Sequence, residues 1–328
     1  MKKTMLVGVL AFGVLTGSAN AVEIIITSEI PVTTNPSPYV LQFLEEIEAR
    51  TKGAVKGKYF PASQLYNDRD ALAALGTGAV HMVWPVASRL ELFDKRTGLL
   101  SLPFGLTQNQ MTNKCFSSGL AKQMSGYLEP TGMQVLGFLR TAELLFLMRD
   151  KDIASVADLK GKKVRVVGGK VMLDAMASVH ASPISMAASE MSVALSQGAI
   201  DGAMTSPAGW ADVLGTTAKY GVLFPGMSLA TSPVVVDKVW FDGLDAQHRE
   251  AISSVLDSII EKQWRETVEK DRALVEQMEQ KGSQYRVVDS AEVEKLRAAF
   301  KTAAAGFTKE HADAIAQVER LNSTCSVN

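Results

Sequence analysis

The sequence predicts an α/β protein built from two lobes. Apolar strand-like runs alternate with helix-period segments from residue 22 onward, and the same alternation begins again after residue 130. A chain of 328 residues also favours two compact lobes over one. We expect each lobe to hold a mixed sheet flanked by helices.

The first lobe begins with VEIIITSEIP (22–31), an apolar strand that ends at a proline. YVLQFLEEIEARTKG (39–53) has helical spacing, with Leu41, Leu44 and Ile47 on one side and a glycine at its end. The segments that follow are a strand at 54–61, a short glycine-ended helix at 68–78 and a strand at 79–88.

The second lobe repeats this pattern. Strands are predicted at 133–140, 143–149 and 162–167, and a helix is predicted at 171–180. A further strand, helix and strand follow at 184–186, 189–198 and 200–206.

From Asp245 the chain changes to a long amphipathic helix, with Asp245 as its N-cap and Gly282 as its end. At 1.5 Å per residue such a helix reaches on the order of 50 Å, long enough to brace both lobes. We expect the first lobe to contain 22–145 and about 236–265, and the second to contain 146–235 and about 266–328 with the C-terminal helices. Strands that cross between the lobes would join them.

The N-terminus indicates export. MKKTMLVGVLAFGVLTGSANA has two lysines, an apolar stretch and a small-residue cleavage motif, so residues 1–21 are expected to be a signal peptide. A membrane anchor is the alternative, but the apolar run is about half of the ~20 residues that a spanning helix needs. We therefore expect a periplasmic protein. Its 34 Lys+Arg nearly balance its 35 Asp+Glu, which argues against nucleic acid as a partner.

Cys115 and Cys325 are the only cysteines. In an exported protein a lone pair is more often bonded than free, so a disulfide is expected, with two unlinked thiols as the alternative. The bond would tie the C-terminal tail to the body of the protein.

Motifs for catalysis, metals and cofactors are missing from the sequence. The histidines are scattered and no HExxH or cysteine cluster occurs, so no metal site is predicted. GMSLA at 226–230 lacks the final glycine of a nucleophile elbow, and the Gly168–Lys170 run lacks the spacing of a phosphate loop. Nothing assembles a nucleophile, a base and an oxyanion site, so neither an enzyme nor a cofactor is predicted.

Arg165 is the residue that most needs explanation, because it interrupts a valine run in KKVRVV. Val164 and Val166 can face the core while Arg165 faces the other way. The strand ends at Gly168, where a ligand can approach the backbone closely, and ligands of open α/β sheets bind beyond the carboxyl ends of strands. A guanidinium there fits a carboxylate bidentately. The alternatives are an exposed arginine or one paired with a core carboxylate.

A family resemblance supports the carboxylate site. DLKGKKVRV at 158–166 and SPISMAASEMSVALSQGAIDG at 182–202 resemble the signature of the solute-binding proteins of tripartite ATP-independent periplasmic (TRAP) transporters, the DctP-like family. FPASQL at 60–65, ALGTGAV at 74–80 and LPF at 102–104 agree. The resemblance implies a two-lobed periplasmic binding protein fold that closes on a small organic acid, with Arg165 clamping the carboxylate.

Departures from the family pattern bear on the ligand. Family members that bind acidic sugars look as though they carry three polar residues that this chain lacks. These are a second arginine on the strand before the DLKG turn, a glutamate after the GAV strand and an asparagine after IDG, and the matching residues here are Leu145, Val86 and Thr205. Arg149 is present but stands at the strand end. Because few polar groups remain, we expect an apolar or aromatic monocarboxylate.

Aromatic side chains are further candidates for the cleft. Trp84 and Trp210 are expected to flank it, with Phe104 as a weaker candidate, and Met204 adjoins Thr205. Ordinary core packing is the alternative for each.

The resemblance implies delivery of the acid to TRAP membrane subunits, through docking of a monomer on an inner-membrane permease. A sensory receptor of the same fold, an exported enzyme acting on carboxylates, and a binder of polar keto or sugar acids are the alternatives.

Overall fold

The computed structural model describes residues 21–327. The predicted signal peptide therefore lies outside the described residues, apart from Ala21. Within residues 21–327, no helix combines the length and the apolar character needed to cross a membrane.

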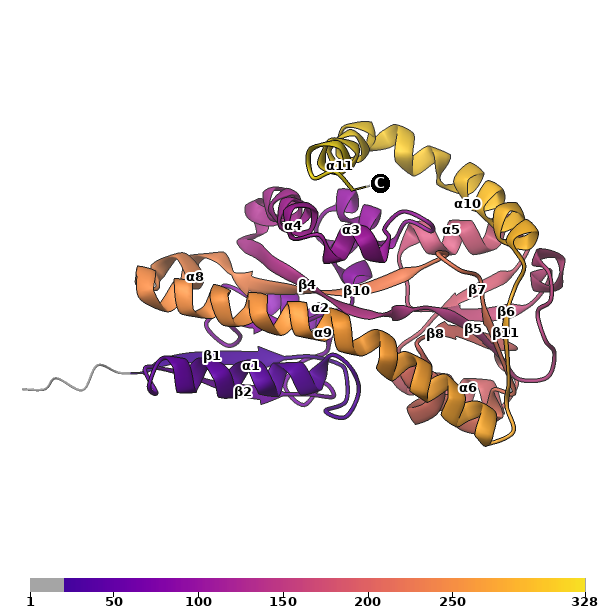
Figure 1. Ribbon diagram of the computed structural model, residues 1–328, viewed down its shortest axis with the longest axis horizontal. Helices are drawn as coiled ribbons and strands as arrows, with labels where there is room; N and C mark the ends of the chain where they lie inside the picture. Colours follow the sequence, from indigo (N-terminus) through magenta and orange to yellow (C-terminus); the bar gives the residue numbers. More distant parts are fainter. Residues whose placement is uncertain (1–20, 328) are drawn as a thin grey trace, which may run out of the picture.

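Lobe I is built on a five-stranded sheet of order β2-β1-β3-β10-β4 (Figure 1). The first three of these strands are parallel, and β10 runs antiparallel to both β3 and β4. Helices and short 3₁₀ turns cover both faces of the sheet. The bounds are β1 Val22–Thr27, α1 Ser37–Arg50, β2 Val55–Phe60, α2 Asp68–Ala74, β3 Met82–Val83, η1 Ala87–Leu92, η2 Lys95–Ser101, α3 Gln108–Thr112, α4 Lys114–Leu128, β4 Met133–Glu143 and β10 Leu229–Asp237.

Lobe II is built on a six-stranded sheet of order β11-β9-β5-β8-β6-β7. Strands β6, β7 and β8 are parallel, so their carboxyl ends meet at one edge of the sheet, and β5 is antiparallel to β8 and β9. The bounds are β5 Leu145–Met148, β6 Lys163–Val166, α5 Lys170–Ser178, β7 Ser182–Ser185, α6 Met191–Ser196, β8 Gly202–Thr205, α7 Pro207–Gly209, β9 Tyr220–Leu223 and β11 Gln284–Val287. The α/β class predicted from the sequence is confirmed, with two mixed sheets.

A long helix, α9 (Ala246–Gln280), runs along both lobes (Figure 1). Its N-cap is Asp245, whose side chain accepts from the backbone N–H of His248, as the sequence predicts. Ile252 and Ile259 in its first half belong to a lobe I core cluster, whereas Val275 and Met278 near its end belong to a lobe II cluster. The helix therefore braces the two lobes through apolar contacts at both ends.

The predicted lobe boundaries need two corrections. β10 joins the lobe I sheet, so 229–237 belongs to lobe I and not to lobe II. The C-terminal helices divide in the same way: α10 (Ser290–Glu310) packs on α5 of lobe II, but α11 (Ala312–Thr324) packs on α4 of lobe I. Local patterns show where a strand or helix begins, but they do not show which sheet it joins.

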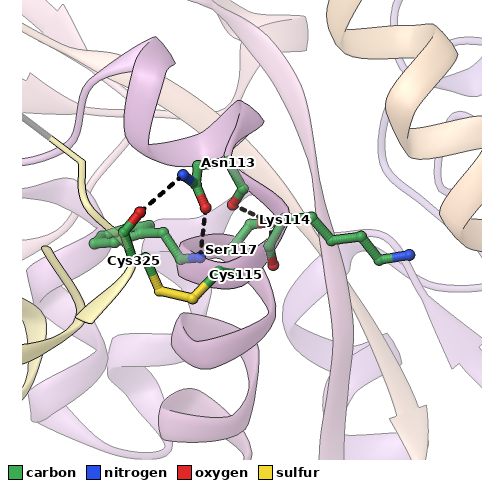
Figure 2. Close-up of a disulfide and its surroundings, with 6 residues drawn as sticks. Asn113, Lys114, Cys115, Ser117 and Cys325 are labelled. Atoms are coloured by element: carbon green, nitrogen blue, oxygen red, sulfur yellow. Dashed lines mark hydrogen bonds between the residues drawn. A yellow bond between two sulfur atoms is a disulfide. The ribbon is translucent and has the colours of Figure 1, made fainter.

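Cys115 on α4 and Cys325 after α11 form a disulfide (Figure 2). Their Cα atoms lie 5.6 Å apart across a sequence separation of 210 residues. The side-chain amide of Asn113 donates to the carbonyl oxygen of Cys325 at 3.2 Å and so fixes the tail beside the bond (Figure 2).

One prediction for helix α1 was wrong in detail. Leu41 is 46% exposed, and the helix buries Tyr39, Val40, Phe43 and Ile47 instead. Apolar residues occur on more than one side of this helix, so spacing alone did not identify the packed side.

Candidate ligand cleft between the lobes

Arg165 lies at the carboxyl edge of the lobe II sheet. On β6 it stands beside Ile184 of β7 and Ala203 of β8, while Val164 and Val166 point into the opposite core cluster. Its Nε donates to the carbonyl oxygen of Met186 and its Nη1 to that of Met204, each at 3.1 Å. Neither sequence-based alternative for Arg165 fits, because the residue is only 3% exposed and forms no ion pair within residues 21–327.

Burial lowers the pKa of Arg165 to about 10, so the side chain stays charged at neutral pH. The negative charge of Glu29 in lobe I raises this pKa and so opposes the effect of burial. The positive charge of Arg89, also in lobe I, lowers it further. Both lobe I side chains are therefore close enough to act electrostatically on Arg165. Arg89 and Glu29 are loosely paired at 3.6 Å.

Asp68 holds the lobe I wall in place. Its carboxylate oxygens accept from the backbone N–H groups of Glu29 and Val86, each at 2.9 Å. The residue is fully buried, and burial followed by the charge of Glu29 raises the pKa of Asp68 to about 7. Asp68 thereby joins the loop after β1, which contains Glu29, to the loop after β3, which leads into η1 and Arg89.

A small cavity of about 50 Å³ lies between the lobes, at the end of β6, and Arg165 itself does not line it. Its lining is mainly apolar, and Ser88 and Thr231 each contribute a buried hydroxyl without a hydrogen-bond partner. Val166 follows Arg165 directly, and Met204 supplies the carbonyl that accepts from it. The apolar lining comes from Val86, Ala87, Leu100, Leu144, Val166, Val167, Met172, Met204, Leu229 and Ala230.

The structure brings together some of the predicted site residues. Val86 and Met204 line this cavity. Thr205 ends β8 directly opposite Leu145 on β5, one residue beyond the carbonyl that binds Arg165. Leu145 is 2% exposed and packs in the lobe II core beside Trp210.

The two tryptophans predicted to flank the cleft are both fully buried in core clusters. Trp84 packs against Phe43 in the lobe I core, with ring centroids 6.1 Å apart. Trp210 is fully buried in lobe II, where its Nε1 donates to the carbonyl oxygen of Ala218 at 2.9 Å. These contacts agree with the core-packing alternative for both tryptophans.

Phe104 packs against the C-terminal helix α10. Its ring lies 6.4 Å from the ring of Phe300, and the guanidinium carbon of Arg297 lies 4.2 Å from its ring centroid. These contacts agree with the core-packing alternative for Phe104, and its role in the cleft stays a prediction.

Arg89, Glu29 and Asp68 were missed by the sequence reasoning. Arg89 follows the strand-like run at 79–88, so its place after the carboxyl end of a parallel strand could have identified it, as it did Arg165. Asp68 carries no such pattern, because its partners are backbone groups of distant loops.

The fold and the cleft define a two-lobed solute receptor with a buried cation between its lobes. The family model for bacterial extracellular solute-binding proteins, family 7 (DctP), matches residues 28–310, and the chain belongs to this family. The chain is accordingly a TRAP-type solute-binding protein of the periplasm, a binding protein and not an enzyme.

Relatives with known names are similar over much of the chain. The C4-dicarboxylate-binding periplasmic protein DctP of Shewanella loihica is 26% identical over 73% of this chain and 70% of its own. The 2,3-diketo-L-gulonate-binding periplasmic protein YiaO of Escherichia coli is 25% identical over 74% of each chain. For the DctP of Vibrio cholerae the match covers 65% of the relative's length.

Solved structures share the fold. A TRAP periplasmic solute-binding protein from Shewanella oneidensis with bound succinate has a TM-score of 0.82 and 25% identity, covering 92% of this chain and 99% of that one. One from Chromohalobacter salexigens with bound D-glucuronate has a TM-score of 0.84 and 19% identity, with the same coverage.

Proposed function

We propose that this receptor binds a small organic acid anion, a monocarboxylate with a mainly apolar or aromatic body, and delivers it to TRAP membrane subunits. The main support for this proposal is the buried guanidinium of Arg165. It has no carboxylate partner among residues 21–327. A buried charge without its counter-ion is costly, so an anionic ligand would stabilise the closed cleft.

The Arg165 guanidinium is well prepared for a carboxylate. Its two protein hydrogen bonds use Nε and one N–H of Nη1. One N–H of Nη1 and both N–H groups of Nη2 have no acceptor among residues 21–327, so the guanidinium can still donate two parallel hydrogen bonds to a carboxylate. The Met186 and Met204 carbonyls fix the orientation of the guanidinium.

Arg89 is a second cation for the same anion. Its Nε is buried without a hydrogen-bond partner, and its pairing with Glu29 is loose at 3.6 Å. A carboxylate bound between Arg89 of lobe I and Arg165 of lobe II would compensate the repulsion between them. The anion would thus connect the lobes as they close.

The rest of the ligand is expected to be apolar because the side chains between the lobes offer few polar groups, although Arg165 does not itself line the interlobe cavity. The interlobe cavity is lined mostly by aliphatic side chains and methionines. Val86, Leu145 and Thr205 offer little hydrogen bonding where sugar-acid binders of the family are expected to carry polar groups.

A polar keto or sugar acid is the second candidate, favoured by the charged wall of lobe I. Glu29 and Arg89 face the clamp together, and Asp68 lies buried behind them. Such a wall could bind hydroxyl groups. The succinate and D-glucuronate found in similar folds also belong to polar acids.

A thermal-shift screen followed by calorimetry tests the proposal, with benzoate, phenylpyruvate, 4-methyl-2-oxopentanoate, succinate, galacturonate and glucuronate as probes. We expect the largest shifts with the aromatic and branched keto acids. The largest shift with a sugar acid, and none with these acids, would contradict the apolar ligand but not the receptor. No binding of any acid would contradict the receptor for organic acids.

We further propose that the receptor docks on its inner-membrane permease as a monomer. Light scattering coupled to size exclusion should give the mass of one chain, with and without the best acid of the screen. A dimer in either state would contradict this part of the proposal.

A further inference from the structure

A hydrogen bond crosses from one lobe to the other at the mouth of the cleft. Glu91 belongs to η1 of lobe I, and its Oε2 accepts from the backbone N–H of Lys170 at 3.0 Å. Lys170 is the first residue of α5 in lobe II. Among residues 21–327 no side chain of lobe II caps this helix, and a carboxylate of the other lobe occupies its N-terminus.

The backbone before α5 leaves space for this carboxylate. Gly169 has φ +86°, and a Cβ on it would lie 2.6 Å from Oε1 of Glu91. A side chain at this position would therefore push Glu91 away from the helix. The glycine makes the close approach of the two lobes possible.

Glu91 has no other strong partner in this position. Its Oε1 is buried without a hydrogen-bond partner, and no ion pair within residues 21–327 includes Glu91. Burial raises the pKa of the Glu91 carboxyl, and the hydrogen bond from Lys170 opposes this rise. The charged groups around the adjoining cavity of about 610 Å³ are Arg89, Lys95, Lys170, Asp174, Glu310 and His311.

We propose that Glu91 is a positioning residue that latches the closed receptor, by capping α5 of lobe II from lobe I. This inference deepens the proposed function and rests on it, because a latch has a role only in a receptor that opens and closes. When the lobes separate, the carboxylate and the Lys170 N–H both return to water. The latch therefore contributes to the lifetime of the closed complex and little to the first encounter with a ligand.

Association and dissociation rates measured by stopped-flow fluorescence test the latch. The probe is whichever of benzoate, phenylpyruvate, succinate and glucuronate binds the unmodified protein most tightly. Glu91→Ala should raise the dissociation rate about tenfold, with the association rate changed less than about twofold. Glu91→Gln keeps a hydrogen-bond acceptor and should stay within about threefold of the unmodified rate.

Two controls separate the latch from a merely structural role. Asp174→Ala removes a carboxylate that lines the same cavity and pairs with Lys170 of its own helix, and it should leave both rates unchanged. The unfolding temperature of the ligand-free Glu91→Ala protein should equal that of the unmodified protein.

A double-mutant cycle with Gly169 adds a geometric test. Gly169→Ala should speed dissociation in the unmodified protein, and it should do so much less in the Glu91→Ala background, where the added Cβ meets no carboxylate. The backbone strain at this position is common to both backgrounds and cancels.

The outcomes distinguish the two proposals. If the unmodified protein binds an acid and Glu91→Ala releases it at the same rate, the latch is overturned and the receptor function stands. If the unmodified protein binds none of the acids, the proposed function is overturned, and the latch with it.

Discussion

Arg165 of β6 donates to the carbonyl oxygen of Met204 on β8 at 3.1 Å, so a charged side chain is held by the backbone of the neighbouring strand. This bond and the one to Met186 define the direction of the guanidinium before any ligand arrives. Preorganisation of this kind reduces the entropy lost on binding.

Replacing Arg165 should weaken binding without unfolding the protein. We expect Arg165→Ala and Arg165→Lys each to cost at least ~2 kcal/mol of binding free energy, because an ammonium cannot hold both carbonyls and also present a fork. Calorimetry with the best acid of the screen measures the loss. The control is Arg149→Lys, because Arg149 also donates to a lobe II carbonyl, that of Leu195, but stands outside the cleft. Equal affinity in Arg165→Lys would mean that the fork geometry is not used.

Trp210 should contribute to stability and not to ligand affinity. Trp210→Phe removes the donor to the Ala218 carbonyl and leaves a small cavity, so the free energy of unfolding should fall by about 1–3 kcal/mol. Urea unfolding and calorimetry together measure both quantities. Trp240→Phe, at a partly exposed tryptophan of lobe I, serves as the matched control. If Trp210→Phe lowers ligand affinity and leaves the free energy of unfolding unchanged, Trp210 contacts the ligand.

Asp68 should make stability depend on pH. Its folded pKa of about 7 lies above the ~3.9 of an unfolded aspartate, so the folded state holds a proton that the unfolded state has lost between these values. The free energy of unfolding should therefore fall as pH rises from about 4 to about 7, by an amount on the order of a few kcal/mol, and then stay level.

Urea unfolding across this pH range tests Asp68 when the unmodified protein is compared with Asp68→Asn. In Asp68→Asn the unfolding free energy should no longer fall between about pH 4 and pH 7. The variant should also be less stable at every pH, because the NH₂ of the new amide faces a backbone N–H. Asp70→Asn on the exposed side of the same helix should keep the slope. An unchanged slope in Asp68→Asn would show that Asp68 stays ionised in the folded protein.

The disulfide should stabilise the whole protein and hold α11 on lobe I. Because Cys115 and Cys325 close a loop of 210 residues, replacing both with serine should cost between about 2 and 5 kcal/mol of unfolding free energy. Hydrogen exchange should rise first in α11, which keeps polar contacts to lobe I such as that between Gln110 and Asn322. Unchanged stability would mean that these contacts alone hold the tail.

Local sequence patterns were sufficient for the architecture. The Asp245 cap, the helical spacing after it and the alternating strands predicted elements that depend on neighbours within a few residues. The sheet that β10 joins and the lobe that α11 covers depend on contacts between distant segments. Those assignments needed the structure.

The candidate site likewise combines residues that local sequence reveals with residues that only distant contacts reveal. Arg165 could be found because a fixed charge inside a valine strand conflicts with its surroundings. Glu91 is an ordinary residue of a short turn, and it gains its role from Lys170, 79 residues later in the chain. Trp84 and Trp210 were placed in the cleft because ring size alone does not tell a core side chain from a cleft side chain.

The C-terminal helices form a second path between the lobes. α10 lies on α5 of lobe II, the chain turns at His311, and α11 is bonded to α4 of lobe I (Figure 1). If lobe II moves away from lobe I, α10 is expected to move with it. The disulfide between Cys115 and Cys325 holds the end of α11 on lobe I. We therefore expect the C-terminal segment to limit how far the two lobes can separate.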